Sequence, residues 1–312
     1  MNKKLHIAVY VMPWEVDEFY ELCYRLKTCS KYVKNRTNEI VLDVSLNLSK
    51  KLINWEESQI PMSLLQDKFN HALKLCDWCD IKVNIVWDEG EFGCNDKRRN
   101  IIEETTSEYV CFVDPDIVFN ETALYYMLQA IDNVDVPYAV ISQELPRMWD
   151  SSWDSLVAKK YINLDYKGDE HYINFDFTEI NFPEEVNIEI NNGLKFSGGF
   201  LTTISSKLAK TIGIPKSLGP YKLDDTFLLF CSMIMHQVLG PNHIKQYILR
   251  GLTIAENRKY QDQYLRKYLT MDKKYLKNKE EIENKGMQDP DFINAIEDFK
   301  ANKLQKIVGE LK

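Results

Sequence analysis

The sequence has no apolar run that approaches the roughly 18 residues of a membrane-spanning helix. It also shows no secretory leader, because residues 1–4 run directly into a short apolar stretch without the longer hydrophobic region of a signal peptide. The 7 cysteines are odd in number and have no paired spacing, which fits reduced thiols better than a disulfide framework. These three absences predict a cytoplasmic protein without a membrane span.

Zinc ligands are scarce as well. Cys76 and Cys79 form a lone Cys-x-x-Cys pair, and His71 is the one histidine close to it in the sequence. A structural zinc site needs a second cysteine pair or suitably spaced histidines. We therefore expect these cysteines to be two small apolar residues on a helix, and we predict no zinc.

Positive charge is in deficit, since the formal net charge is −8. Proteins that coat nucleic acid without sequence preference need a clustered positive surface, so the acidic balance argues against that class. One segment has the opposite charge balance, because basic residues outnumber acidic ones between Asn257 and Lys285. Such a segment is usually a solvated helix surface, although a local basic groove is compatible with it.

The hydrophobic content of 45% over 312 residues is enough for the core of one large domain. Strand and helix patterns alternate through the first half of the chain, which predicts an α/β fold with a mainly parallel sheet. We predict strands over 5–11, 40–48, 81–87, 109–113 and 138–142, and helices over 14–33, 63–79, 97–105 and 121–131.

The pattern becomes less regular after Gln143, with an alternating region over 172–190 and an apolar strand over 195–204. The tail from Asn257 has helical spacing that breaks near Gly286 and Pro290, which predicts two terminal helices. We therefore divide the chain into three parts. These are a nucleotide-binding half over 1–143, an acceptor-side α+β half over 144–255, and a helical extension over 256–312.

The apolar run 109–113 ends abruptly in Asp114 and Asp116. Two carboxylates at a strand tip repel each other unless a cation or solvent compensates. Mg²⁺ and Mn²⁺ take carboxylate oxygens and often share their other positions with substrate phosphates, so the pair predicts a metal and a nucleotide-linked substrate. The alternative is an Asp-Pro turn with Asp116 in solvent. Pro13 and Asp88 also follow predicted strands, and the carboxyl ends of parallel strands are where ligands bind.

Four motifs in this order resemble family 2-type glycosyltransferases of the GT-A fold, over residues 1–255. They are Gly93 with Arg98-Arg99-Asn100, Ser107-Glu-Tyr-Val-Cys-Phe-Val-Asp114-Pro-Asp116, Ser197-Gly198-Gly199-Phe200, and Leu223-Asp224-Asp225-Thr226-Phe227. The resemblance implies a Rossmann-like domain that moves a hexosyl or pentosyl unit from a nucleotide-diphosphate donor, UDP-sugar first, to a hydroxyl acceptor. It also implies that the Asp-x-Asp carboxylates hold Mn²⁺ or Mg²⁺ on the diphosphate.

The resemblance assigns roles to the acids. Asp116 would be the first metal ligand, and Asp114 would hold the donor ribose or a metal-bound water. Asp225, with Asp224 beside it, matches the general base of an inverting transfer at the start of a helix over 226–235. A base must lie within hydrogen-bond reach of the acceptor hydroxyl, and a helix N-terminus is a suitable place for a carboxylate. The alternative is that one of the two acids only caps this helix.

Three further positions are expected on the donor side. Arg99 would contact the diphosphate or brace the Asp-x-Asp loop, unless it is an exposed helix cation. Gly198 and Gly199 would let the backbone approach a sugar closely, although a strand bulge uses glycines in the same way.

The sequence departs from the family at two places. The family often has a histidine as a late metal ligand, whereas this chain reads Leu252-Thr-Ile-Ala-Glu256-Asn257. Glu256 or Asn257 would substitute, or His236 or His243 would reach in from elsewhere in the chain. The opening strand leads into Pro13 and Trp14, where Trp14 either stacks on a nucleobase or lies in the core.

The acceptor is less defined by the sequence. Trp149, Asp150 and Trp153 place indoles and a carboxylate at helical spacing, which suits a sugar or a base but also suits a core helix. This segment faintly resembles tailed-phage glycosyltransferases that modify DNA. The acceptor is therefore a glycan or, alternatively, a hydroxymethylated cytosine in DNA. A nucleotidyltransferase or noncatalytic nucleotide-binding protein is a further alternative, but the chain lacks a Gly-rich, Lys-containing phosphate loop.

Overall fold

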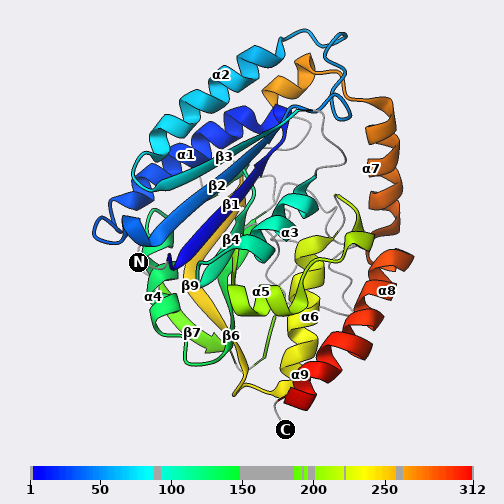
Figure 1. Ribbon diagram of the computed structural model, residues 1–312. Helices are drawn as coiled ribbons and strands as arrows, with labels where there is room; N and C mark the ends of the chain where they lie inside the picture. Colours follow the sequence, from blue (N-terminus) through cyan, green and yellow to red (C-terminus); the bar gives the residue numbers. More distant parts are fainter. Residues whose placement is uncertain are drawn as a thin grey trace.

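The computed structural model describes residues 3–87, 93–147, 186–191, 193–195, 201–220, 223–257 and 263–310, apart from the side chains of 144–147, 253, 256 and 282–284. Its centre is a nine-stranded sheet in the order β3-β2-β1-β4-β8-β6-β9-β5, with β7 paired to β9 (Figure 1). Helices cover both faces of this sheet. The α/β fold class predicted from the sequence is confirmed.

One half of the sheet is parallel and Rossmann-like. It consists of β3 (Asp80–Val86), β2 (Ile40–Asn47), β1 (Leu5–Val11) and β4 (Tyr109–Val113). The register pairs Val9 with Val44 on one side and with Val113 on the other. All four strands therefore end at the same edge of the sheet, as the sequence pattern predicted.

The other half is mixed. β8 (Leu201–Ser205) runs antiparallel to β4 and to β6 (Tyr138–Arg147), and β9 (Ile244–Glu256) runs parallel to β6. The short β5 (Ile117–Phe119) and β7 (Asn187–Asn191) are both antiparallel to β9. The strand predicted over 195–204 is thus observed from Leu201, and only the end of the alternating region over 172–190 lies among the described residues.

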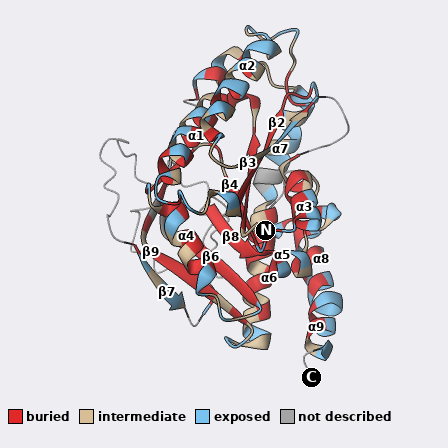
Figure 2. Cartoon of the chain, turned by 60° about the vertical axis from the view of Figure 1, so that its left-hand side comes forward, coloured by how far each residue is buried: buried red, intermediate tan, exposed pale blue. Residues whose placement is uncertain are grey.

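Two apolar clusters fill the space between the sheet and the helices (Figure 2). The first lies under α1 (Val16–Ser30), α2 (Met62–Leu73) and α4 (Ala123–Asp132). The second lies under α3 (Cys94–Glu104), α5 (Ser206–Ile212) and α6 (Asp224–Leu239). Helix α1 shows the logic, because Phe19, Leu22 and Leu26 recur at helical spacing and are all buried.

The C-terminal segment packs on the second cluster. α8 (Pro290–Asp298), a π-helical stretch (Phe299–Leu304) and α9 (Gln305–Glu310) follow one another, and Phe292, Ile296 and Phe299 are buried. The predicted breaks near Gly286 and Pro290 are confirmed, but the described residues beyond 256 contain three α-helices rather than two.

In the described part of the basic segment, which omits residues 258–262, the α-helix α7 (Lys273–Lys285) begins at Lys273. Residues 264–268 form a 3₁₀ turn, and Met271 makes an isolated bridge to Ile53. The Asp272 carboxylate accepts hydrogen bonds from the backbone amides of Lys274 and Tyr275, which fixes the start of α7. The α-helix expected from Asn257 onward is therefore not observed over residues 263–272.

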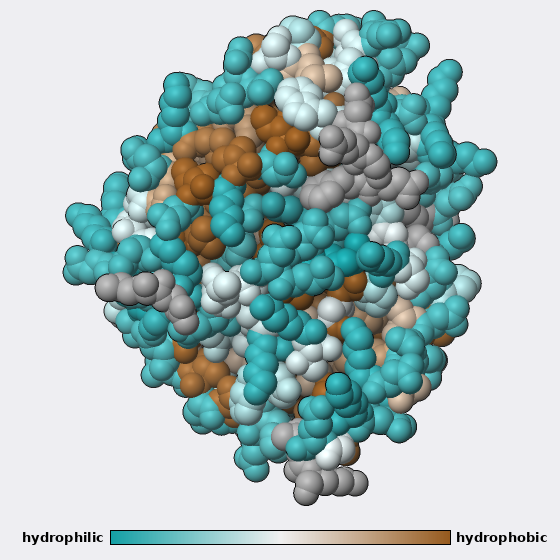
Figure 3. Space-filling view, in the orientation of Figure 1, coloured by the Kyte–Doolittle hydropathy of each residue, from teal (hydrophilic) through white to brown (hydrophobic). Residues whose placement is uncertain are grey.

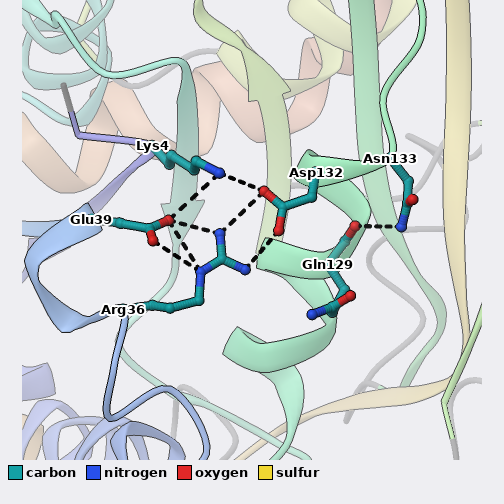
Figure 4. A network of polar contacts seen from close by, with 6 residues as sticks. All are labelled: Lys4, Arg36, Glu39, Gln129, Asp132 and Asn133. Atoms are coloured by element: carbon teal, nitrogen blue, oxygen red, sulfur yellow. Dashed lines mark hydrogen bonds and ion pairs between the residues drawn. The ribbon is translucent and has the colours of Figure 1, made fainter. Parts of the chain in front are cut away.

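At the amino ends of β1 and β2, four charged side chains form a network (Figure 4). The Arg36 guanidinium contacts Asp132 at 2.8 Å and Glu39 at 2.7 Å, and the Lys4 ammonium contacts Asp132 at 2.5 Å. Two cations therefore face two carboxylates. The network ties the start of the sheet to the end of α4.

Strand β3 lies at one edge of the described sheet, where apolar side chains gather at the surface (Figure 3). Val83 is 48% exposed and Trp87, just after the strand, is 44% exposed. Lys82 breaks this apolar run, which is how natural edge strands discourage pairing with another chain.

Among the described helices, none is both long and apolar enough to cross a bilayer.

Candidate functional site

The candidate site lies at the carboxyl edge of the parallel strands. Strand β4 is buried along its whole length, and Asp114 and Asp116 follow it around the buried Pro115. The backbone amide of Asn257 donates to the Asp116 carbonyl, so the end of β9 is fastened beside this turn. Both carboxylates are half-buried rather than solvated, which argues against a simple surface turn.

Arg98 on α3 joins two of the predicted acids. Its Nη1 donates to Asp224 Oδ2 at 2.8 Å and its Nη2 donates to Asp114 Oδ1 at 3.2 Å. The guanidinium also lies 5.1 Å from the centre of the Phe112 ring. Burial disfavours its charge, but the neighbouring carboxylates, Asp224 first, hold the pKa of Arg98 well above its ordinary value. One buried cation thus connects the tip of β4 to the start of α6.

Arg99 does not reach this site. Its Nε donates to the Ile214 carbonyl at 2.9 Å, its Nη2 donates to the Pro215 carbonyl at 3.2 Å, and its Nη1 pairs with Asp96. Because one residue along a helix is a rotation of about 100°, Arg98 and Arg99 point in different directions. The expectation that Arg99 braces the Asp-x-Asp loop is corrected in favour of Arg98.

The loop held by Arg99 also meets the start of α3 at Gly93. A Cβ built on Gly93 would lie 2.4 Å from the Pro220 carbonyl oxygen, a distance that real side chains do not show. The same carbonyl accepts a hydrogen bond from the Asn95 amide at 2.9 Å. Glycine at position 93 therefore permits the loop before α6 to dock on α3.

Negative charge is in excess at this edge. Burial raises the pKa of Asp114 to about 7, with Arg98 opposing the rise and Asp116 and Asp225 adding to it. Glu15 belongs to the same group, because burial and then the charge of Asp116 raise its pKa well above the ordinary value. Five carboxyl groups gather here, namely those of Glu15, Asp114, Asp116, Asp224 and Asp225. Such a concentration of acid is suited to a bound cation.

Asp225 stands in the first turn of α6. Its Oδ1 accepts from the Thr226 amide at 2.7 Å, and burial followed by the charge of Asp224 raises its pKa. The residue in the N-cap position is Leu223, which has left-handed backbone angles, φ 38° and ψ 30°. The alternative that Asp224 or Asp225 serves as the N-cap is therefore not observed. The turn instead holds Asp224 against Arg98, with Asp225 beside it, at some conformational cost.

The donor set fits a hard cation that keeps water or phosphate oxygens. Among the described residues no three metal-ligating side chains converge, so protein oxygens alone would not complete a coordination shell. Asp114 and Asp116 are the two carboxylates at the strand tip. Glu256 pairs through its backbone with Ile117, and its side chain lies outside the description. Asn257 directs its side-chain amide to Glu21.

Trp14 is in the core. Its side chain is 2% exposed, the Arg266 guanidinium lies 5.5 Å above its ring, and the Tyr275 ring is 6.2 Å away. Stacking of Trp14 on a nucleobase is thereby corrected, because its ring is already covered. Pro13 is buried in the short 3₁₀ turn that follows β1.

Six predicted positions lie outside the described residues, so nothing structural is added to them. They are Asp88, Trp149, Asp150, Trp153, Gly198 and Gly199.

Sequence reasoning missed Arg98, Glu15 and a polar pair at the ends of β1 and β2. In that pair, the buried Asn47 amide donates to the Tyr10 hydroxyl at 2.7 Å. The one available signal was position, because Glu15 follows a predicted strand as Asp114 does, and Asn47 lies at the end of another.

No protein-family model matches the chain, and no curated protein is similar to it by sequence. Among solved structures, S. aureus TarS 1–349 in complex with UDP-GlcNAc is similar at 15% identity, with 82% of this chain and 59% of that chain covered and a TM-score of 0.46. The mannosyltransferase PcManGT from Pyrobaculum calidifontis, in complex with GDP-Man and Mn2+, is similar at 11% identity, with 84% and 59% covered and a TM-score of 0.46. The chain thus spans about three fifths of the length of these structures. Likeness at this level concerns the course of the chain, and function has to be inferred from the side chains.

Proposed function

We propose that this protein is a metal-dependent glycosyltransferase that takes a sugar from a nucleotide-diphosphate donor, UDP-sugar first, and transfers it to a hydroxyl acceptor. One observation carries the proposal. Five carboxyl groups gather at the carboxyl edge of a Rossmann-like sheet, and Arg98 bridges the tip of β4 to the start of α6. A noncatalytic nucleotide-binding protein would have no use for the second acid pair on α6.

The donor side is assigned to the tip of β4. Asp116 and Asp114 would hold Mg²⁺ or Mn²⁺, which as a Lewis acid stabilises the negative charge that develops on a leaving diphosphate. The raised pKa of Asp114 supports this role, since a divalent cation would offset the burial and the neighbouring negative charge that now favour its protonated form. Arg98 keeps the Asp114 carboxylate in one orientation.

The acceptor side is assigned to the start of α6. Asp225 would accept the proton of the acceptor hydroxyl while that oxygen forms its bond to the anomeric carbon and the bond from that carbon to the diphosphate breaks. A carboxylate whose pKa is raised by burial is a stronger base than one in water, which suits general base catalysis near neutral pH. Attack from the side opposite the leaving group would invert the anomeric centre.

A second acceptor class is favoured by one observation. Lys273, Lys274 and Lys277 are exposed on α7, although the chain as a whole is acidic. A local basic surface suits a phosphodiester polymer, so hydroxymethylated cytosine in DNA is the second candidate acceptor beside a glycan. Parallel assays with glycans and with DNA that contains 5-hydroxymethylcytosine distinguish the two.

The test is calorimetric titration of nucleoside diphosphates, UDP first, with and without Mn²⁺. Binding that requires the metal and is lost in Asp116→Asn supports the donor assignment. A matched control is Asp132→Asn, because Asp132 lies in the ion network at the opposite edge and should leave binding unchanged. If no nucleoside diphosphate binds to the wild type under either condition, the proposal is wrong.

A further inference from the structure

Three consecutive basic residues of α3 are buried, and each is bound to a different part of the molecule. Lys97, Arg98 and Arg99 are between 7% and 8% exposed. Lys97 pairs with Asp43 on β2, Arg98 pairs with Asp114 and Asp224, and Arg99 donates to the carbonyls before α6. Successive helix residues are rotated by about 100°, so the three side chains leave α3 in three directions.

The Lys97 contact continues into a buried polar chain. The Asp43 carboxylate that pairs with Lys97 also lies 3.2 Å from Nε2 of His6, and Nδ1 of His6 lies 3.0 Å from the Thr105 hydroxyl. The side chains of Lys97 and Asp43 are about one-tenth exposed, and that of His6 is 3% exposed. Burial alone would raise the pKa of Asp43, but the hydrogen bonds from His6 and Lys97 hold it below its ordinary value. The pair is therefore ionic and shielded from solvent.

These buried polar contacts hold α3 at two points along its axis. Lys97 lies in its first half, whereas Thr105 immediately follows its last residue, and both are tied through Asp43 and His6 to the neighbouring strands β1 and β2. A helix fixed at two heights to one sheet face can neither rotate about its axis nor slide along it. The rotation is what decides where Arg98 points.

We propose that Lys97, acting with Asp43 and His6, is a positioning residue that fixes the rotation of α3 and thereby holds the Arg98 guanidinium between Asp114 and Asp224. The inference rests on the proposed function for its meaning, because Asp114 lies on the donor side and Asp224 on the acceptor side. Lys97 itself touches neither acid in the described contacts. Lys97 would therefore fix the position of Arg98 between the donor side and the acceptor side without contacting either acid.

The first test uses the protein without metal or nucleotide. In ¹⁵N NMR spectra, a guanidinium held by two carboxylates shows slowed rotation and separate Nη signals, and Arg98→Lys identifies which signals are lost. Lys97→Met is expected to abolish or shift the Arg98 signals, and Lys97→Arg to restore them in part. Ile102→Ala is the matched control, since Ile102 is a buried apolar residue of the same helix and its loss destabilises α3 without touching the ion pairs.

The second test is the Mn²⁺ dissociation constant. Loss of an outer partner of a metal ligand commonly changes metal affinity by about tenfold, and Lys97→Met should do so only through Arg98. In the Arg98→Met background, Lys97→Met is therefore expected to change the dissociation constant by less than about twofold. Full additivity of the two effects, or Arg98 signals unchanged in Lys97→Met, would overturn the proposal.

Two controls keep the outcomes separate. If Lys97→Met does not fold, the double variant Asp43→Leu/Lys97→Met removes both charges together and leaves no buried unpaired ion, so the same spectra can be recorded. If the wild type binds no Mn²⁺, the proposed function fails, whereas the Arg98 signals of the metal-free protein still decide the positioning role.

Discussion

The amino and carboxyl edges of the parallel strands differ in how their charges are balanced. At the amino edge, Lys4 and Arg36 face Glu39 and Asp132 in a network of two cations and two carboxylates (Figure 4). At the carboxyl edge, five carboxyl groups gather, and Arg98 pairs with two of them, Asp114 and Asp224. The same sheet thus carries a neutralised ion network at one end and an acidic surplus at the other.

The pKa values of the aspartates are shifted in opposite directions at the two edges. Hydrogen bonds from Lys4 and Arg36 outweigh burial and lower the pKa of Asp132, and the hydrogen bond to Asp132 raises the pKa of Lys4. Every shift there favours the charged form. At the carboxyl edge, burial raises the pKa of Asp114 and of Asp225, which disfavours the charged form. The charges of the amino edge are therefore balanced within the protein, whereas the carboxyl edge keeps a surplus of negative charge that the proposed cation would balance.

The largest expected effect is on catalysis. Asp225→Asn removes the proposed base without changing its size, so we expect kcat for sugar transfer to fall by about 10²–10⁴-fold. Binding of the nucleoside diphosphate with Mn²⁺, measured by calorimetry, should stay within about threefold, because Asp225 lies on the acceptor side. Wild-type turnover in this variant would remove the base assignment.

The next effect is on folding stability. Asp224→Asn leaves the buried Arg98 without its closest carboxylate, and breaking a buried pair costs about 3 kcal/mol of the free energy of unfolding. Asp132→Asn removes a carboxylate from a network in which Asp132 is 35% exposed, so we expect a loss under about 1 kcal/mol. Urea denaturation of the two variants compares the edges directly. Equal losses would show that Arg98 is not held as the geometry indicates.

Metal affinity should depend on pH at the carboxyl edge. Because the pKa of Asp114 is raised to about 7, its carboxyl is protonated below that pH and must lose its proton before it can bind a cation. Between pH 7 and pH 6 we therefore expect the Mn²⁺ affinity to fall by up to about tenfold for one displaced proton. Calorimetry in buffers of different ionisation enthalpy reports the proton released, and an affinity flat across this range would contradict the shift.

The smallest effect has the opposite sign. With a folded pKa near 7, above the unfolded value of about 4, Asp114 lowers the stability of the metal-free protein as pH rises through that interval. Asp114→Asn should therefore stabilise the protein at pH 8, by about 1 kcal/mol after solvent screening of this 36% exposed side chain. At pH 5 the gain should largely vanish, because the wild-type carboxyl is then protonated. If Asp114→Asn instead lowered the free energy of unfolding at pH 8, the raised pKa of Asp114 would be contradicted.

Much of the site follows from local sequence. A buried strand that ends in Asp114 and Asp116 is recognisable from its own residues, and parallel topology then places other strand ends beside it. The choice between Arg98 and Arg99 did not follow, because it depends on the rotation of α3, which is set by the Lys97 contact to a distant strand. The sequence pattern placed the start of this helix at Lys97, whereas it begins at Cys94.

Trp14 shows the same limit. An apolar residue after the first strand can face a ligand or the core. Trp14 faces the core because Arg266 and Tyr275, from the far end of the chain, cover its ring. Periodicity carries no information on contacts of that sequence separation. The folding of the basic segment back over the N-terminal half was for this reason not predicted.

The left-handed backbone of Leu223 has a consequence for laboratory evolution. A leucine in this region is less stable than glycine by about 1–2 kcal/mol, yet its side chain packs on the second apolar cluster and its backbone aims Asp224 and Asp225. A library randomised at position 223 and sorted by heat resistance alone should fill with glycine and asparagine. Sorting the same library by turnover should enrich different residues. Position 223 would therefore separate selection for stability from selection for activity.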